Sequence, residues 1–151
     1  MKLVVGSDHA GFALKTRLVL WLKSAAGGRN QVKDMGTDSL DSCDYPDFAA
    51  AVARAVARGK ASRGILICGS GIGMAIAANK IRGVRAAVTW NPESAGLAAE
   101  HNHANVLCMP ARFVGTATAK TMVRNFLKTS FGTGRHTQRV DKIKTLDQCG
   151  R

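Results

Sequence analysis

The chain has 151 residues and a mass of 16.0 kDa, which is long enough for one sizeable core, so we expect a single domain over residues 1–151. Hydrophobic residues make up 46% of the chain and proline occurs only 3 times, which excludes a disordered or collagen-like protein. The net charge of +12 points to an anionic partner, and nucleic acid, a membrane surface and a phosphorylated metabolite are the classes to weigh.

The sequence predicts neither a membrane span nor export. No apolar stretch approaches the roughly 20 uncharged residues that a span needs, and the apolar run after Met1 is too short for a signal peptide. The four cysteines form no C-x-x-C pair and are too sparse for a disulfide scaffold. We therefore expect a cytoplasmic protein without membrane contact.

The charge distribution argues against a nucleic-acid partner. Acidic residues gather between Asp34 and Asp47, whereas residues 48–92 contain no carboxylate. The basic residues are dispersed, and aromatic residues make up only 5% of the chain, which disfavours a platform for stacking bases. A small phosphorylated ligand suits this pattern better.

Short apolar runs alternate with helical patterns, which is typical of a parallel sheet covered by helices on both faces. A β-branched run over residues 2–6 predicts the first strand. An apolar stripe predicts a helix that ends near residue 27 and contains Leu14, Leu18, Trp21 and Leu22. A short strand around residues 31–34 and a polar loop should then lead to an Ala-rich helix that Asp47 caps and Gly59 ends.

The second half of the chain continues this alternation. Residues 64–68 form the strongest predicted strand, and a glycine loop joins it to a helix over residues 74–81. Two further strands are expected over residues 84–89 and 104–109, with Asn91 capping the helix between them and Pro92 beginning it. The last two helices are predicted over residues 116–128 and 137–148, and the final one is a candidate for docking on a partner subunit.

The glycine loop, Gly69-Ser70-Gly71-Ile72-Gly73, is the first candidate binding element. Glycines allow a tight turn that directs N–H groups outward, and the helix start adds its positive dipole end, so we expect an anion there. The spacing matches neither the dinucleotide fingerprint nor a Walker-type loop. An ordinary strand-to-helix turn is the alternative.

Cys68 stands at the carboxyl end of the strongest strand, where open α/β sheets bind ligands and where these N–H groups would stabilise a thiolate. It is a candidate base or nucleophile, with a buried structural cysteine as the alternative. Asp8 and His9 follow the first strand and should lie at the same edge of the sheet. We expect structural roles for the remaining cysteines, Cys43, Cys108 and Cys149.

Basic residues at the ends of two later helices are further candidates. His101 either takes part in chemistry or complements the helix dipole. Arg135 and Arg139 share one face if the last helix begins early, which would form a clamp for phosphate, and a solvated basic face is the alternative. One H-x-H and one D-H pattern fall short of a metal site, so no metal is expected.

Six collinear motifs resemble the ribose-5-phosphate isomerase B family, which also includes the galactose-6-phosphate isomerase subunits. They cover nearly the whole chain, which makes them far more specific together than singly. The motifs are GSDHAGF at 6–12, DYP at 44–46, GILICGSGIG at 64–73, AANK at 77–80, HN at 101–102 with ANV at 104–106, and GRH at 134–136 with Arg139.

This resemblance implies a cofactor-free aldose-ketose isomerase of the pentose phosphate pathway that interconverts D-ribose 5-phosphate and D-ribulose 5-phosphate through a cis-enediol. It implies a three-layer Rossmann-like α/β domain with a mostly parallel five-stranded sheet and a C-terminal helix that extends to a partner subunit. A homodimer or dimer of dimers, with the active site at the interface, is the implied assembly.

The resemblance also implies roles for individual residues. Cys68 would be the base, because residues 74–77 lack the carboxylate that the other branch of the family uses. Ser70 would help to shuttle protons beside the oxyanion hole of the glycine loop, and His101 of the neighbouring subunit would open the sugar ring. The implied substrate contacts are Asp8, His9, Tyr45, Gly69, Gly71, Ile72, Gly73, Asn102, Arg112, Arg135, His136 and Arg139.

Three alternatives stay open. The same chemistry would serve a six-carbon substrate, allose or galactose 6-phosphate, because only pocket depth would discriminate. The charge of +12 also fits a basic nucleic-acid-binding protein, whose salt-dependent binding would not need Cys68. A non-catalytic sugar-phosphate or nucleotide sensor would use the same glycine loop.

Overall fold

The computed structural model describes residues 1–147 and contains one five-stranded sheet with the order β2-β1-β3-β5-β4. All four neighbouring pairs are parallel, so the sheet is wholly and not only mostly parallel. Each strand lies within or overlaps one of the predicted strand segments, and four of them are apolar runs whereas β2 has the sequence QVKD. The strands are β1 (Lys2–Ser7), β2 (Gln31–Asp34), β3 (Arg63–Cys68), β4 (Ala86–Val88) and β5 (Val106–Pro110).

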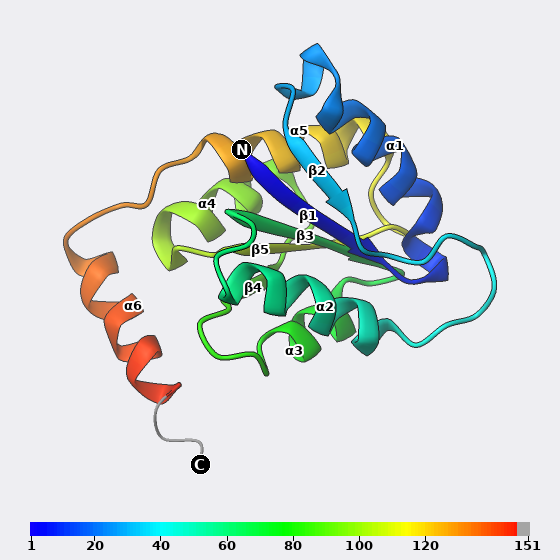
Figure 1. The fold of residues 1–151 in the computed structure, drawn as a ribbon. Helices are drawn as coiled ribbons and strands as arrows, with labels where there is room; N and C mark the ends of the chain where they lie inside the picture. The colour runs from blue at the N-terminus through cyan, green and yellow to red at the C-terminus, as the bar shows by residue number, and fades with distance from the viewer. Residues whose placement is uncertain (148–151) are drawn as a thin grey trace.

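Helices cover both faces of the sheet, which confirms the predicted three-layer α/β domain (Figure 1). One face is covered by α1 (Phe12–Lys23), α4 (Pro92–Asn102) and α5 (Thr116–Lys128). The other face is covered by α2 (Tyr45–Ala57) and α3 (Ile72–Ala78). Two 3-10 turns, η1 (His9–Gly11) and η2 (Ala25–Gly27), flank α1, and α6 (Arg135–Leu146) lies at the side where the strands begin.

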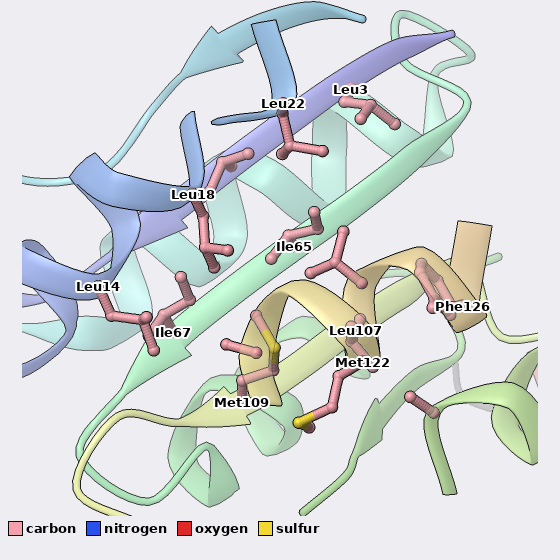
Figure 2. Packing of buried hydrophobic residues seen from close by; sticks show 14 of the residues in the cluster. Leu3, Leu14, Leu18, Leu22, Ile65, Ile67, Leu107, Met109, Met122 and Phe126 are labelled. Carbon is pink, nitrogen blue, oxygen red and sulfur yellow. The ribbon is translucent and has the colours of Figure 1, made fainter. Parts of the chain in front are cut away.

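The larger core lies under α1 and α5. Figure 2 shows Leu14, Leu18 and Leu22 of α1 pointing onto Ile65 and Ile67 of β3, with Met122 and Phe126 of α5 lying over Leu107 and Met109 of β5. Leu18, Leu22 and Phe126 are fully buried, and each such side chain contributes about 1.5–3 kcal/mol to stability. This packing fixes the sheet and thereby the loops at its carboxyl edge.

The start of α2 differs from the prediction. Asp47 is not the cap but lies in the first turn, because the helix already begins at Tyr45 with Asp44 at the N-cap position. Pro46 explains the early start, since its fixed φ suits the first turn and it needs no hydrogen-bond partner there. The Asp47 carboxylate still lies near the positive end of the helix dipole.

The elements after β3 also have different bounds. The helix predicted over residues 74–81 is α3, which begins at Ile72 and ends at Ala78. It ends there because the side chain of Asn79 exchanges two hydrogen bonds with the backbone of Ala86, at 2.7 and 2.9 Å. The strand predicted over residues 84–89 is the shorter β4, since Val84 closes a turn on the Ile81 carbonyl.

The helix predicted over residues 137–148 begins two residues earlier, directly after Gly134, and Gln148 and Cys149 lie outside the described residues. The predictions for α4 and α5 are confirmed. Asn91 caps α4 by accepting a hydrogen bond from the Ser94 N–H at 2.8 Å, and Pro92 begins the helix. Within residues 1–147, no helix is both long and apolar enough to cross a membrane.

Candidate active site

Cys68 ends β3 and faces the glycine loop. Its side chain is buried, at 5% exposure, and its sulfur accepts a hydrogen bond from the Gly71 N–H at 3.1 Å. Gly71 reaches this position with φ +77°, in the left-handed region, where a Cβ would also crowd the Met109 backbone. The loop therefore folds back on the thiol and directs a backbone hydrogen-bond donor at its sulfur.

The remaining loop residues start α3. The Ser70 hydroxyl accepts a hydrogen bond from the Ile72 N–H at 3.3 Å, and the Ser70 side chain is half-buried. N–H groups in the first turn of a helix have no intrahelical carbonyl to bind, so those of Gly73 and Met74 can serve a ligand. The arrangement can bind an oxyanion beside the Cys68 sulfur.

Asp8 and His9 lie at the same edge, because Ser7 of β1 pairs with Ile67 of β3 and both strands end there. The Asp8 carboxylate is 6% exposed and accepts a hydrogen bond from the Gly11 N–H at 3.0 Å. His9 Nδ1 accepts one from the Cys43 N–H at 3.3 Å. With Nδ1 accepting this bond, Nε2 is the ring nitrogen that can donate a hydrogen bond to a ligand.

Tyr45 and Arg112 border the glycine loop on two sides. A Cβ on Gly73 would lie 2.6 Å from Cζ of the Tyr45 ring, so only glycine lets the ring approach this closely. A Cβ on Gly69 would lie 3.1 Å from Nε of Arg112, whose backbone N–H also binds the Gly69 carbonyl at 3.2 Å. These residues form the carboxyl-edge group, which comprises Asp8, His9, Tyr45, Cys68, Gly69, Ser70, Gly71, Ile72, Gly73 and Arg112.

Sequence reasoning missed the ion pair that supports this group. Lys15 of α1 is almost wholly buried and binds Asp34 at 2.6 Å. Asp34 also accepts the Gly36 N–H, and the backbone of Thr37 binds the Ser7 carbonyl, so the segment after β2 is tied to the end of β1. A lysine on the otherwise apolar buried stripe of α1 was the available signal.

An exposed aromatic pair at this edge was also missed. Trp90 follows β4 and Phe113 follows β5, and their ring centroids are 5.1 Å apart. Both rings are substantially exposed, at 45% and 65%. Phe113 directly follows Arg112 in sequence, and the signal for the pair was an aromatic residue just beyond each of two strands.

The other predicted residues lie at the opposite end of the sheet and form the amino-edge group: His101, Asn102, Arg135, His136 and Arg139. The rings of His101 and His136 stack with centroids 4.2 Å apart and an angle of 9°, which joins the end of α4 to the start of α6. Arg135 and Arg139 are exposed and one helical turn apart, because α6 begins early.

Positive charge gathers in the amino-edge group. Partial desolvation of the His136 ring, followed by the charges of His101, Arg135 and Arg139, lowers its pKa, while Glu100 acts in the opposite direction. A phosphate dianion would relieve this repulsion. The group can therefore bind an anion through two guanidinium groups and a histidine.

The described chain does not bring the two groups together. α4 runs back from the carboxyl edge, so its last residues, His101 and Asn102, lie where β5 begins. Cys68 pairs with Pro110 at the far end of that strand. The five residues of β5 span about 15 Å, so His101 cannot reach a ligand held at Cys68 of the same chain.

Cys108 differs from Cys68 although both face α2 and α3. Complete burial, with a smaller contribution from Cys68, raises the pKa of the Cys108 thiol far above its usual range. That supports its predicted structural role, whereas Cys43 is half-buried and its sulfur lies 3.9 Å from His9 Nδ1. No cluster of three or more His, Cys, Asp or Glu side chains suited to a metal occurs in residues 1–147.

Comparison with known proteins gives a consistent result. A family model described as Ribose/Galactose Isomerase matches residues 3–143. Ribose-5-phosphate isomerase B of Escherichia coli is 45% identical over 97% of this chain and 97% of its own length. D-erythrulose-4-phosphate isomerase 2 of Mycolicibacterium smegmatis is 42% identical over 99% of this chain and 95% of its own.

A solved structure extends the similarity to three dimensions. Ribose-5-phosphate isomerase B of Mycoplasma genitalium, determined with bound ribulose 5-phosphate, superimposes with a TM-score of 0.91 at 41% identity. The match covers 97% of this chain and 95% of that one. The sheet, its helices and both edges therefore have counterparts in a protein that holds a sugar phosphate.

Proposed function

Because the chain belongs to the ribose/galactose isomerase family and is an isomerase, we propose that it interconverts D-ribose 5-phosphate and D-ribulose 5-phosphate without a cofactor. The observation that carries this proposal is the Cys68 sulfur, held 3.1 Å from the Gly71 N–H at the edge that also carries Asp8 and His9. A proton carrier and oxyanion donors meet there, as an enediol mechanism requires.

In the proposed reaction, the Cys68 thiolate removes the proton from C2 of the open aldose. The electron pair of the broken C2–H bond forms a double bond between C2 and C1, and the C1 carbonyl oxygen takes up the negative charge. The N–H groups of the glycine loop stabilise this enediolate oxygen. A proton then passes between the two oxygens with help from the Ser70 hydroxyl. Cys68 returns its proton to C1, which completes the ketose without net gain or loss of electrons.

We assign ring opening to His101 and phosphate binding to Arg135, His136 and Arg139. Because these residues lie at the far end of the sheet from Cys68, the proposed site needs the carboxyl-edge group of one subunit and the amino-edge group of another. Asn102 and Arg112 would contact the sugar from the two sides. A homodimer, or a dimer of dimers, is the proposed assembly.

The experiment that tests the function is turnover of ribose 5-phosphate by protein that has been treated with a chelator and desalted. We expect undiminished conversion to ribulose 5-phosphate, observed directly by NMR. Conversion that disappears with the metal and returns on its addition would contradict a cofactor-free mechanism. Binding of the sugar phosphate without conversion would instead favour a sensor.

The length of the substrate is tested in the same assay. The enediol machinery acts only on C1 and C2, so the distance between Cys68 and the phosphate-binding arginines must set the preferred chain length. We expect ribose 5-phosphate to have a higher kcat/KM than allose 6-phosphate, galactose 6-phosphate or a four-carbon sugar phosphate. A higher value for one of these would reassign the substrate but not the chemistry.

A further inference from the structure

A basic groove of about 560 Å³ lies between α2 and the outer edge of the sheet, away from both candidate groups. Its volume is within the range of small-molecule sites. Five cationic side chains line this basic groove: Lys2, Lys33, Arg54, Arg58 and Lys60.

The topology explains why the groove is open. β2 is an edge strand, and α2 must return from it to β3, so α2 packs over β1 and β3 (Figure 1). α1 covers β2 from the other face. In parallel register, Val4 pairs with Lys33, so both side chains project toward the uncovered space beside α2.

The cations of the groove are free to bind a ligand. None of their side chains takes part in a hydrogen bond or ion pair within the part of the chain that the structure describes. Residues 48–92 supply no carboxylate, and Asp34 of β2 binds Lys15 on the opposite face. Arg54 and Arg58 are one helical turn apart at the C-terminal end of α2, so both guanidinium groups can face one anion.

The floor of the groove is apolar. Val4 and Ala55 are 4% and 8% exposed, and the partly buried Met35 and Ala51 extend the surface between them. Methionine adapts readily to flat ligands. Cations around an apolar floor suit a molecule that joins several negative charges to a flat ring system whose face can pack on that floor.

We propose that the basic groove binds a nucleoside di- or triphosphate, with its phosphates on Arg54, Arg58 and Lys60 and its base on Val4, Met35 and Ala51. A nucleic-acid strand fits less well, because its successive bases would need several stacking side chains, whereas the groove has one apolar floor and no aromatic side chain. A second copy related by twofold symmetry also fits less well, since it would place the same five cations against each other.

The test measures binding of ATP by titration calorimetry in saturating ribose 5-phosphate, with inorganic triphosphate as the second probe. We expect ATP to bind saturably and at least about tenfold more tightly than triphosphate. The double variant Arg54→Ala/Arg58→Ala should weaken ATP binding by about 100-fold, since each charge-assisted contact contributes about tenfold. Ala51→Leu should weaken binding of ATP but not of triphosphate.

The matched control is Lys23→Ala/Arg82→Ala, which removes two exposed charges outside the groove and should change ATP affinity less than twofold. Equal losses in both double variants would overturn the proposal in favour of general charge attraction. Failure of ATP to bind at millimolar concentration, or displacement of ATP by ribose 5-phosphate, would also overturn it.

Two further results would identify a different occupant and overturn the nucleotide proposal. One is tighter binding of a uridine homopolymer than of ATP, lost in Arg54→Ala/Arg58→Ala. The other is a change in sedimenting mass in that variant, which would show that a second copy covers the groove. All these measurements are of binding or mass, so they stand apart from the test of isomerase activity.

Discussion

The two edges of the sheet hold their candidate residues in different ways. At the carboxyl edge, Cys68 and Asp8 are buried and each accepts a backbone hydrogen bond, and the Lys15–Asp34 ion pair supports the neighbouring segment. At the amino edge, Arg135 and Arg139 are exposed, and α6 buries only Val140. The fold preorganises the first group, whereas the second depends on a helix with little packing of its own.

The largest expected effect is at the preorganised edge. Cys68→Ala should reduce kcat by about 10³-fold or more, because it removes the proposed proton carrier, while the affinity for ribose 5-phosphate stays nearly unchanged. Single-turnover kinetics and calorimetry measure the two quantities.

Cys108→Ala is the matched control, since it makes the same chemical change on the neighbouring strand β5. Cys108 lies two residues before Pro110, the residue that pairs with Cys68. The variant should keep wild-type turnover and lose about 1–2 kcal/mol of stability, because it only leaves a small cavity. If Cys68→Ala retains most of its kcat, the base lies elsewhere.

The second test joins the two edges. His101→Ala should lose most activity on ribose 5-phosphate and much less on open-chain ribulose 5-phosphate, because its proposed task is ring opening.

Mixing equal amounts of unfolded Cys68→Ala and His101→Ala chains and refolding them together should restore activity at about one quarter of the sites, since half of the dimers carry one intact site. Refolded mixtures that stay inactive would contradict a site shared between subunits.

The exposed amino-edge group should affect binding more than chemistry. Arg139→Ala should raise KM for ribose 5-phosphate by about 10- to 100-fold, which corresponds to about 1.4–2.7 kcal/mol, with a smaller change in kcat. Arg135→Ala should behave similarly, and the control Lys142→Ala on the same helix should leave KM unchanged. The preference for ribose 5-phosphate over free ribose should fall only in the arginine variants; an unchanged preference would make them a solvated surface.

The smallest expected effect is on stability at acid pH and involves His103 at the end of α4. Burial, followed by the charges of Arg85, Arg63 and Lys144, lowers the pKa of His103, whose ring stacks on Phe131 at 4.4 Å. In the unfolded chain His103 therefore binds a proton more readily than in the folded chain. The free energy of unfolding is thus unaffected by the protonation of His103 at neutral pH and falls as the pH drops below about 6.5.

The variant His103→Asn tests this, because asparagine tolerates the left-handed φ of +49° at this position. Its melting temperature should fall less between pH 7.5 and pH 5 than that of the wild type, by about 1–2 °C. Parallel decreases in the two proteins would show that His103 does not contribute to the acid sensitivity.

The sequence was most informative where local chemistry decides the structure. Asn91 and Pro92 predicted the start of α4 correctly because the cap and the first turn involve only neighbouring residues. The bounds of α3 could not be predicted, since Asn79 ends it by binding Ala86 across a turn. The same holds for the site, where the Cys68 loop was predicted but the contact of Tyr45 with Gly73 depends on how α2 crosses the sheet.

The strand order also has a consequence for folding. β1 is made first, yet both of its partners come later, and Ser7 pairs with Ile67 only after the chain has reached the end of β3. Every pairing in the sheet is parallel and needs a long crossover, so loop closure precedes the gain from burial and slows folding. During synthesis, the apolar β1 must therefore stay unpaired on its β3 side until most of the first half of the protein has been made.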